Sequence, residues 1–198
     1  GFDHERIHLE TSSVLIRELP LDLVQRPAQW PTLHPSAGAP SHFPPKAGQD
    51  YPVPRLLSIP ASQVRIGKPA DWPSFGWDNE YGERHDNVQA FRVESLLVSN
   101  GAFLEFIQSG GYLEQRWWTD AGWAWRGFRN SKWPCFWVPE GPAGLHQYRL
   151  RTMFETIPMP WNWPVEVNAH EAAAFCAWRS ARDGQPCRLP TEAEHNAL

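Results

Sequence analysis

The sequence has little of what marks a secreted, membrane-spanning or nucleic-acid-binding protein. Its three cysteines are odd in number and none are spaced as C-x-x-C, so neither a disulfide framework nor a thiolate zinc site is expected. No apolar run approaches the roughly 20 residues of a membrane span, and the opening GFDHERIH lacks the apolar region of a secretory signal. The net charge of −4 gives no basic footprint for nucleic acid. We therefore expect a cytoplasmic protein with reduced cysteines and no nucleic-acid or membrane partner.

Proline and tryptophan are abundant and unevenly placed. Eleven of the 12 tryptophans follow residue 70, which indicates a later domain with a core of large aromatic side chains. Nine of the 20 prolines lie within residues 20–54, a composition typical of an extended linker. We predict a short helical segment over 1–19, a linker over 20–52 and a domain over 53–198. The chain lacks an initiator Met and begins inside a predicted helix, so we expect a segment of a longer protein whose last domain is cut short.

Helix and strand signals are clear in several places. A helix is predicted over 3–19, ended by Pro20, and strands are predicted within LLSIPASQVRIGKP and over 91–98. A second helix should run from Ser99 or Asn100 to about Gln108, before two glycines. A third should follow Asn168 and end at Gly184, and Thr191 with Glu194 forms a capping box for a fourth. The stretches RWWTDAGWAWRGF and CFWVPE are predicted as aromatic pieces around turns.

The first segment carries a candidate metal motif, His4-Glu5-Arg6-Ile7-His8. Two histidines four residues apart bring their imidazoles to one side of a helix, close enough to share a cation. On a helical projection Thr11 and Leu15 fall within about 40° of His4, so both histidines are predicted on a buried, partly apolar face. The spacing alone is weak evidence, because two hydrogen-bonded core histidines would show it too.

Two other readings of this motif demand more than the sequence offers. H-E-x-x-H is the zinc-protease signature, but a protease needs a further ligand from a later segment, and a proline-rich linker follows instead. Glu10 would complete a 2-His-1-carboxylate iron site. It lies about 200° around the helix from His8, however, and we predict that it pairs with Arg6.

Beyond these patterns, several stretches together carry a family resemblance over essentially the whole chain. The stretches are HERIHLETSSVLIRELPL, FGWDNEYG, VSNGAFLEFIQSGGY, RLRTMFETIPMPWNWPVEVN and RLPTEAE. The chain resembles the non-haem iron sulfoxide synthases, and the first and fourth stretches favour the ovothiol branch (5-histidylcysteine sulfoxide synthases) over the ergothioneine branch. The resemblance implies an α+β chain with a truncated C-type-lectin-like, formylglycine-generating-enzyme fold, preceded by the last helix of a DinB-like bundle.

The resemblance also implies a cofactor, substrates and ligands. Fe(II) would be held by His4, His8 and a third histidine from a bundle helix outside this chain. The implied reaction joins cysteine sulfur to an imidazole carbon of histidine, using O2, and gives the sulfoxide. The resemblance places a catalytic tyrosine in a later part of the fold, beyond this chain. None of Tyr51, Tyr81, Tyr112 and Tyr148 is therefore assigned that role. A non-catalytic lectin-like binding module remains the alternative from another class.

Three smaller features are predicted to be structural. The loop FGWDNEYGERH, residues 75–85, is predicted as a turn in which Asp78 and Asn79 bond local backbone, rather than as an active-site wall. The aromatic cluster is predicted as core rather than as a stacking surface for a ligand; its members are Trp117, Trp118, Trp123 and Trp125. Cys176 lies on the apolar stripe of its helix and is predicted as a small core residue.

Overall fold

A computed structural model describes residues 1–30, 37, 42–142 and 144–198. Part of the predicted linker, residues 31–36 and 38–41, lies outside the described residues. The chain divides into two compact units, Gly1–Val53 with Val98–Gln185, and Pro54–Leu97 with Pro186–Leu198. Each is described by itself, and the predicted boundaries at 19 and 52 stay predictions.

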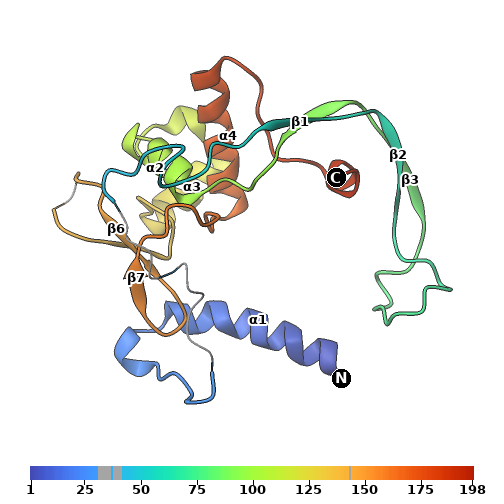
Figure 1. The fold of residues 1–198 in the computed structure, drawn as a ribbon, viewed down its shortest axis with the longest axis horizontal. Coiled ribbons are helices and arrows are strands. Elements are labelled where there is room, and N and C mark those ends of the chain that lie inside the picture. Colours follow the sequence, from blue (N-terminus) through green and yellow to red (C-terminus); the bar gives the residue numbers. More distant parts are fainter. Residues whose placement is uncertain (31–36, 38–41, 143) are drawn as a thin grey trace. The chain divides into compact units, whose positions relative to one another are not determined.

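The first unit is built mainly from helices (Figure 1). Its elements are α1 (Phe2–Glu18), η1 (Leu21–Leu23), α2 (Asn100–Gln108), η3 (Gln115–Trp117), α3 (Asp120–Arg129), β5 (Trp137–Pro139), β6 (Tyr148–Arg151), β7 (Thr156–Pro158) and α4 (Ala169–Asp183). Strands β5, β6 and β7 form one antiparallel sheet in that order. The predicted first helix is confirmed, one residue earlier at each end.

The predicted start and stop signals of α2 and α4 are confirmed by their cap geometry. The Ser99 hydroxyl accepts a hydrogen bond from the Ala102 amide at the start of α2. Asn168 forms a full capping box with Glu171 at the start of α4. Gly184 follows α4 with φ +64°, a left-handed conformation that favours glycine. These caps satisfy backbone groups that a helix leaves unpaired at its ends.

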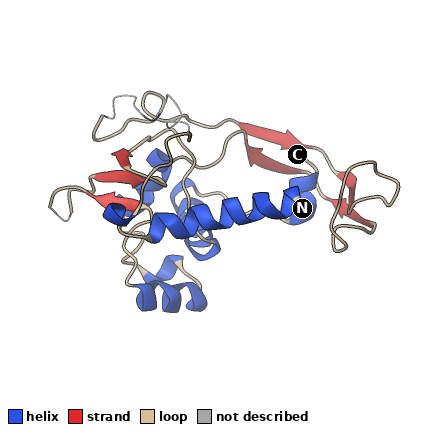
Figure 2. Ribbon diagram, turned by 90° about the horizontal axis from the view of Figure 1, so that it is seen from below, coloured by secondary structure: helices blue, strands red, loops and turns tan. Residues whose placement is uncertain are grey.

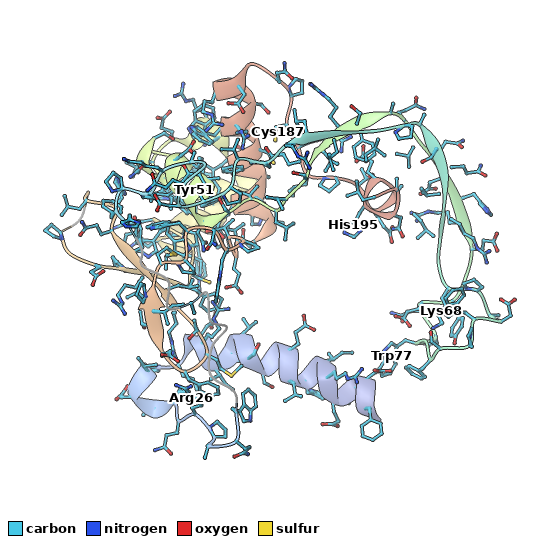
Figure 3. All side chains as sticks on the ribbon, in the orientation of Figure 1. Arg26, Tyr51, Lys68, Trp77, Cys187 and His195 are labelled. Atoms are coloured by element: carbon cyan, nitrogen blue, oxygen red, sulfur yellow. The ribbon has the colours of Figure 1, made fainter. Side chains whose placement is uncertain are left out.

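Large aromatic side chains fill the core between α2, α4 and the sheet. The Phe103 and Phe175 rings stack with centroids 5.3 Å apart, which joins α2 directly to α4. Tyr51 is buried beside α2, with its hydroxyl donating to Glu105 at 2.7 Å (Figure 3). Of the tryptophan cluster, Trp118 is buried and the other three pack against the core, as predicted. Cys176 is also buried, as predicted.

Helix α3 and the three-stranded sheet correct the prediction of turns in these regions. Thr119 caps α3 through its hydroxyl, which accepts from the Gly122 amide, and Asn130 ends the helix with φ +50°. The two internal glycines and four aromatic residues nearby masked this helix, although a cap residue followed by Asp120 is a start signal. The strands contain only three or four residues each, which is too short for an alternating pattern to show.

The second unit is a long antiparallel ribbon with one short helix. Strand β1 (Leu56–Ile59) pairs with β4 (Phe91–Glu94), and β2 (Ser62–Ile66) pairs with β3 (Arg84–Val88). The predicted strand over 91–98 is thus confirmed at its start and ends four residues early. Helix α5 (Glu192–Asn196) begins at Thr191 with the predicted capping box.

Helices and strands are both present, as the predicted α+β class requires, and Figure 2 shows the helices in blue and the strands in red. Among the described residues, no helix is long and apolar enough to cross a bilayer.

Candidate metal centre and its anchoring

The two motif histidines converge on helix α1. The His8 Nε2 atom lies 2.8 Å from His4 Nε2, and the ring centroids are 4.5 Å apart. Two imidazole nitrogens bound to one octahedral metal, each about 2.1 Å from it and about 90° apart, lie roughly 3 Å from each other. The pair therefore fits two neighbouring positions of a metal. In the metal-free chain the same approach is an imidazole–imidazole hydrogen bond.

The surroundings of the pair differ from the predicted buried stripe. Helix α1 contains no buried residue among those described, and His4, His8, Ile7, Thr11 and Leu15 are all exposed. The Thr11 hydroxyl donates back to the Ile7 carbonyl at 2.9 Å, within its own helix. The predicted burial is therefore wrong for residues 1–198, and the alternative of two core histidines does not describe this pair.

Glu10 and Arg6 do not form the predicted pair. The Arg6 guanidinium lies 3.4 Å from the Asp3 carboxylate, one helical turn away in the other direction. That pair is largely exposed and contributes little. Glu10 lies away from the histidine face, as the helical projection predicts.

Helix α1 is held to the rest of its unit near its C-terminal end by Arg17. The Arg17 Nη1 and Nη2 atoms donate to the two carboxylate oxygens of Glu166, each at 2.7 Å. The same guanidinium donates to the Arg151 carbonyl of β6, from Nε at 3.1 Å and from Nη2 at 2.8 Å. Its carbon lies 3.6 Å from the centroid of the Phe136 ring. Only 12% of the Arg17 side chain is exposed.

Arg151 completes this arrangement from the opposite side. Its Nη2 atom donates to the Leu19 carbonyl, just after α1, at 3.3 Å. Burial lowers the pKa of Arg151, and the neighbouring Arg17 lowers it further. The only signal in the sequence is the position of Arg17, about 180° around the helix from His8, and this position does not indicate its distant partners.

An open cavity of about 840 Å³ lies beside this anchor. Its lining includes Glu18, Phe136 and Glu166, together with Trp125 and Arg129 of α3. Cys135 also lines it, and burial raises the pKa of its thiol, with Glu171 adding to the effect and Arg17 opposing it. A thiol with a raised pKa is a poor nucleophile at neutral pH, so Cys135 is not assigned a catalytic role.

The buried carboxylate of Glu171, which also lines the cavity, accepts hydrogen bonds from two donors. The Tyr112 hydroxyl donates to Glu171 Oε1 at 2.5 Å, and the Asn168 amide donates to Oε2 at 3.0 Å. Burial raises the pKa of Tyr112, and also that of Glu171. Tyr112 and Tyr51 thus each donate to a carboxylate, and neither is assigned a catalytic role.

The FGWDNEYG loop lies in the second unit, between β2 and β3. Figure 3 shows Lys68 and Trp77 there. The Lys68 amine donates to Ser74 Oγ at 2.7 Å and to the Phe75 carbonyl at 2.5 Å. The Asp78 carboxylate accepts from the Asn79 amide at 3.0 Å, as the predicted local turn requires. The loop is therefore stabilised by hydrogen bonds among its own and adjacent residues.

Within the described part of the chain, no three His, Cys, Asp or Glu side chains come together as a metal site. The histidine pair of α1 offers two ligands.

Comparison with known proteins places this geometry in a family context. The family model described as sulfatase-modifying factor enzyme 1-like domain matches residues 41–197. A hercynine oxygenase of Mycolicibacterium thermoresistibile is 39% identical over 127 residues, 63% of this chain and 25% of that protein. The bovine formylglycine-generating enzyme is 27% identical over 181 residues, 80% of this chain and 42% of the enzyme. Ergothioneine biosynthesis protein 1 of Schizosaccharomyces pombe is 28% identical over 126 residues, 63% of this chain and 13% of that protein.

The chain spans only about a quarter of the hercynine oxygenases it matches.

Proposed function

The chain belongs to the family of the sulfatase-modifying factor enzyme 1-like domain, and on that basis we propose that it is part of an Fe(II)- and O2-dependent sulfoxide synthase. The proposed reaction joins the sulfur of cysteine to an imidazole carbon of histidine or a histidine derivative. The single observation that carries the proposal is the convergence of His4 Nε2 and His8 Nε2 at 2.8 Å on a helix that is anchored to the family domain. Resemblance to enzymes named for hercynine oxygenation supports an oxygen-dependent reaction on an imidazole compound.

His4 and His8 would hold the iron, with a third histidine from a DinB-like segment outside residues 1–198. Bound Fe(II) supplies activation of O2 and a common attachment point for a thiolate and an imidazole. Neutral imidazoles add no negative charge to the metal, so the site keeps its attraction for an anionic thiolate. Their placement at one end of a helix leaves the rest of the coordination sphere open to substrates.

The ovothiol branch is the first candidate, because HERIHLETSSVLIRELP and MPWNWPVEVN match its pattern. The ergothioneine branch is the second, because the similar curated proteins are named for hercynine and ergothioneine. The two differ in the imidazole substrate, histidine in one and hercynine, the betaine of histidine, in the other. The cavity of the first unit does not distinguish them, because its lining carries charges of both signs.

The deciding experiment supplies cysteine, Fe(II) and O2 with either histidine or hercynine to a protein in which residues 1–198 are joined to a DinB-like segment. Product mass identifies the sulfoxide and the imidazole used. His8→Ala should abolish stoichiometric Fe(II) binding and turnover, because the two remaining imidazoles cannot hold the metal in its place. Unchanged iron content in the folded variant would refute the ligand assignment.

Glu10→Gln is the matched control on the same helix. Because Glu10 lies away from the histidine face, this variant should keep its iron and most of its activity, with at most about 1 kcal/mol lost from a surface interaction. Residues 1–198 alone should bind iron weakly and form no sulfoxide, since they offer two of the three proposed ligands. Full turnover by residues 1–198 would show that no third histidine is needed from elsewhere.

A further inference from the structure

We propose that Arg17 is a positioning residue: it fixes the direction and the roll of α1, so that the face carrying His4 and His8 is turned away from the segments of the first unit that Arg17 contacts and is left open. This inference rests on the proposed function only in its explanation of why the histidine face must be held open. The geometric part stands on contacts of Arg17 with three separate groups of the same unit.

The contacts constrain the guanidinium from several directions at once. The Glu166 carboxylate receives two parallel hydrogen bonds, and the Arg151 carbonyl receives two more. The Phe136 ring covers the flat face of the group at 3.6 Å. Such a planar fork with a stacked face is satisfied in one orientation only, and lysine cannot reproduce it.

Helix geometry converts this fixed end into a fixed histidine pair. His8 lies nine residues from Arg17 and His4 thirteen, which corresponds to about 14 Å and about 20 Å along the helix axis. A tilt of about 10° at the anchor would move both histidines together by about 2–3 Å relative to the rest of the first unit. Arg17 also lies about 180° around the helix from His8, so docking by the arginine face presents the histidines on the opposite side.

The exposure of the helix agrees with this arrangement. The Arg17 side chain is only 12% exposed, whereas His4 and His8 are exposed. Along α1 no residue counts as buried, so few other contacts compete to set its direction. The return bond from Arg151 to the Leu19 carbonyl holds the chain where it leaves the helix.

The test measures the direction of α1 directly and without metal. Nitroxide labels are placed at Leu9→Cys on α1 and Phe128→Cys on α3, both exposed positions of one unit. The background carries Cys135→Ser and Cys187→Ser, and the buried Cys176 is retained. Pulsed electron paramagnetic resonance then gives the distribution of distances between the two labels.

With Arg17 present, one narrow distance peak is expected. Arg17→Ala should widen the distribution at least twofold, and Arg17→Lys should widen it while keeping the charge. Glu166→Gln should have an intermediate effect and serves as a second variant if Arg17→Ala does not fold. Arg6→Ala, which removes an exposed arginine of the same helix, should leave the peak unchanged.

A broad distribution in the starting protein, or a narrow one in folded Arg17→Ala or Arg17→Lys, would overturn the proposal. A loss of stability alone would not widen the distribution of the folded molecules, so this measurement separates positioning from a merely structural role. Because no iron is involved, the outcome is independent of the His8→Ala test of the proposed function. In the active protein, Arg17→Lys should lower kcat at least tenfold with unchanged Fe(II) content.

Discussion

The Arg17 side chain binds the backbone of Arg151, and the Arg151 side chain binds the backbone of Leu19, two residues after Arg17. The Arg17 guanidinium donates to the Arg151 carbonyl at 2.8 and 3.1 Å, and the Arg151 guanidinium donates to the Leu19 carbonyl at 3.3 Å. Two cations lie close together here, and Glu166 supplies the opposite charge to Arg17. The two side chains are therefore not equivalent: one is fully bonded, and the other has a buried Nη1 atom for which the described residues supply no partner.

This asymmetry predicts different costs for the same substitution. Arg17→Met should lower the free energy of unfolding by about 1–3 kcal/mol. This loss is smaller than that for breaking a fully buried ion pair, because Glu166 is half exposed. Arg151→Met should change it by less than about 1 kcal/mol, since the carbonyl that Arg17 uses remains and a desolvated cation is removed. Urea unfolding of both variants measures the difference. Equal losses would show that the Arg151 side chain, and not its carbonyl, carries the contact.

Gly101 lets Tyr51 approach α2, and this predicts a destabilising alanine substitution. A Cβ added at Gly101 would overlap the Tyr51 ring, which is held in place by its bond to Glu105. Gly101→Ala should therefore cost about 1–3 kcal/mol through displacement of the ring. Gly127→Ala on α3 is the control, because a Cβ there meets no described atom within 4 Å. That variant should stabilise the helix by about 0.5–1 kcal/mol, and thermal unfolding of the two should shift in opposite directions.

Tyr112 supports a buried carboxylate, which gives its removal a pH dependence. Burial raises the pKa of Glu171 above its ordinary value, so the folded state binds this proton more tightly than the unfolded state. Ionisation of Glu171 therefore lowers the free energy of unfolding as the pH rises through the folded pKa. The Tyr112 hydroxyl offsets part of this loss by donating to the carboxylate, and Tyr112→Phe removes that donor. The variant should lose about 1–3 kcal/mol at neutral pH and less near pH 4.

The control for this prediction is Tyr148→Phe. The Tyr148 hydroxyl lies 3.3 Å from His146 Nδ1 rather than against a carboxylate, and burial raises its pKa to about 12. The Tyr148→Phe variant should lose the same free energy of unfolding at pH 5 and at pH 8. Denaturant unfolding at several pH values compares the two variants; a pH-independent loss for Tyr112→Phe would contradict the prediction.

Features set by local sequence could be predicted, and features set by distant contacts could not. Ser99, Asn168 and Thr191 cap their helices as their side-chain chemistry requires, because the partner of each cap lies three residues away. The Glu10–Arg6 pair failed because Asp3 competes for the same arginine on the same helix. The partners of Arg17 lie 134 and 149 residues away, and no local pattern indicates them.

The candidate site shows the same division. The i, i+4 spacing predicted that His4 and His8 share a face, and their side chains do converge. Burial of that face could not follow from the helix alone, because it depends on which segments pack against it. Helix α3 was missed although Thr119 and Asn130 bound it, because its glycines and tryptophans resemble a turn composition more than a helix.

Glu194 in the second unit gives a prediction that is independent of the iron hypothesis. Its carboxylate accepts from Arg188 Nη1 at 2.7 Å, from Arg188 Nη2 at 2.5 Å and from the Thr191 amide at 2.8 Å. The bonds from Arg188, followed by that from the Thr191 backbone, lower the pKa of Glu194 from its ordinary 4.5 to about 2. A depressed pKa means that the ionised form favours folding above the unfolded pKa, and that this contribution is lost as the pH falls through the folded value.

Carboxyl NMR titration should therefore show Glu194 still ionised at about pH 3 in the starting protein. In Arg188→Ala the largest cause of the shift is removed, so the midpoint should rise toward 4.5, while the Thr191 amide keeps it somewhat below that value. Glu194→Gln should lower stability at neutral pH, and its difference from the starting protein should shrink between about pH 5 and about pH 2. Glu192→Gln is the control, since Glu192 pairs with Arg84 at 3.1 Å on an exposed surface. A Glu194 midpoint near 4.5 in the starting protein would show that the Arg188 fork is not formed in solution.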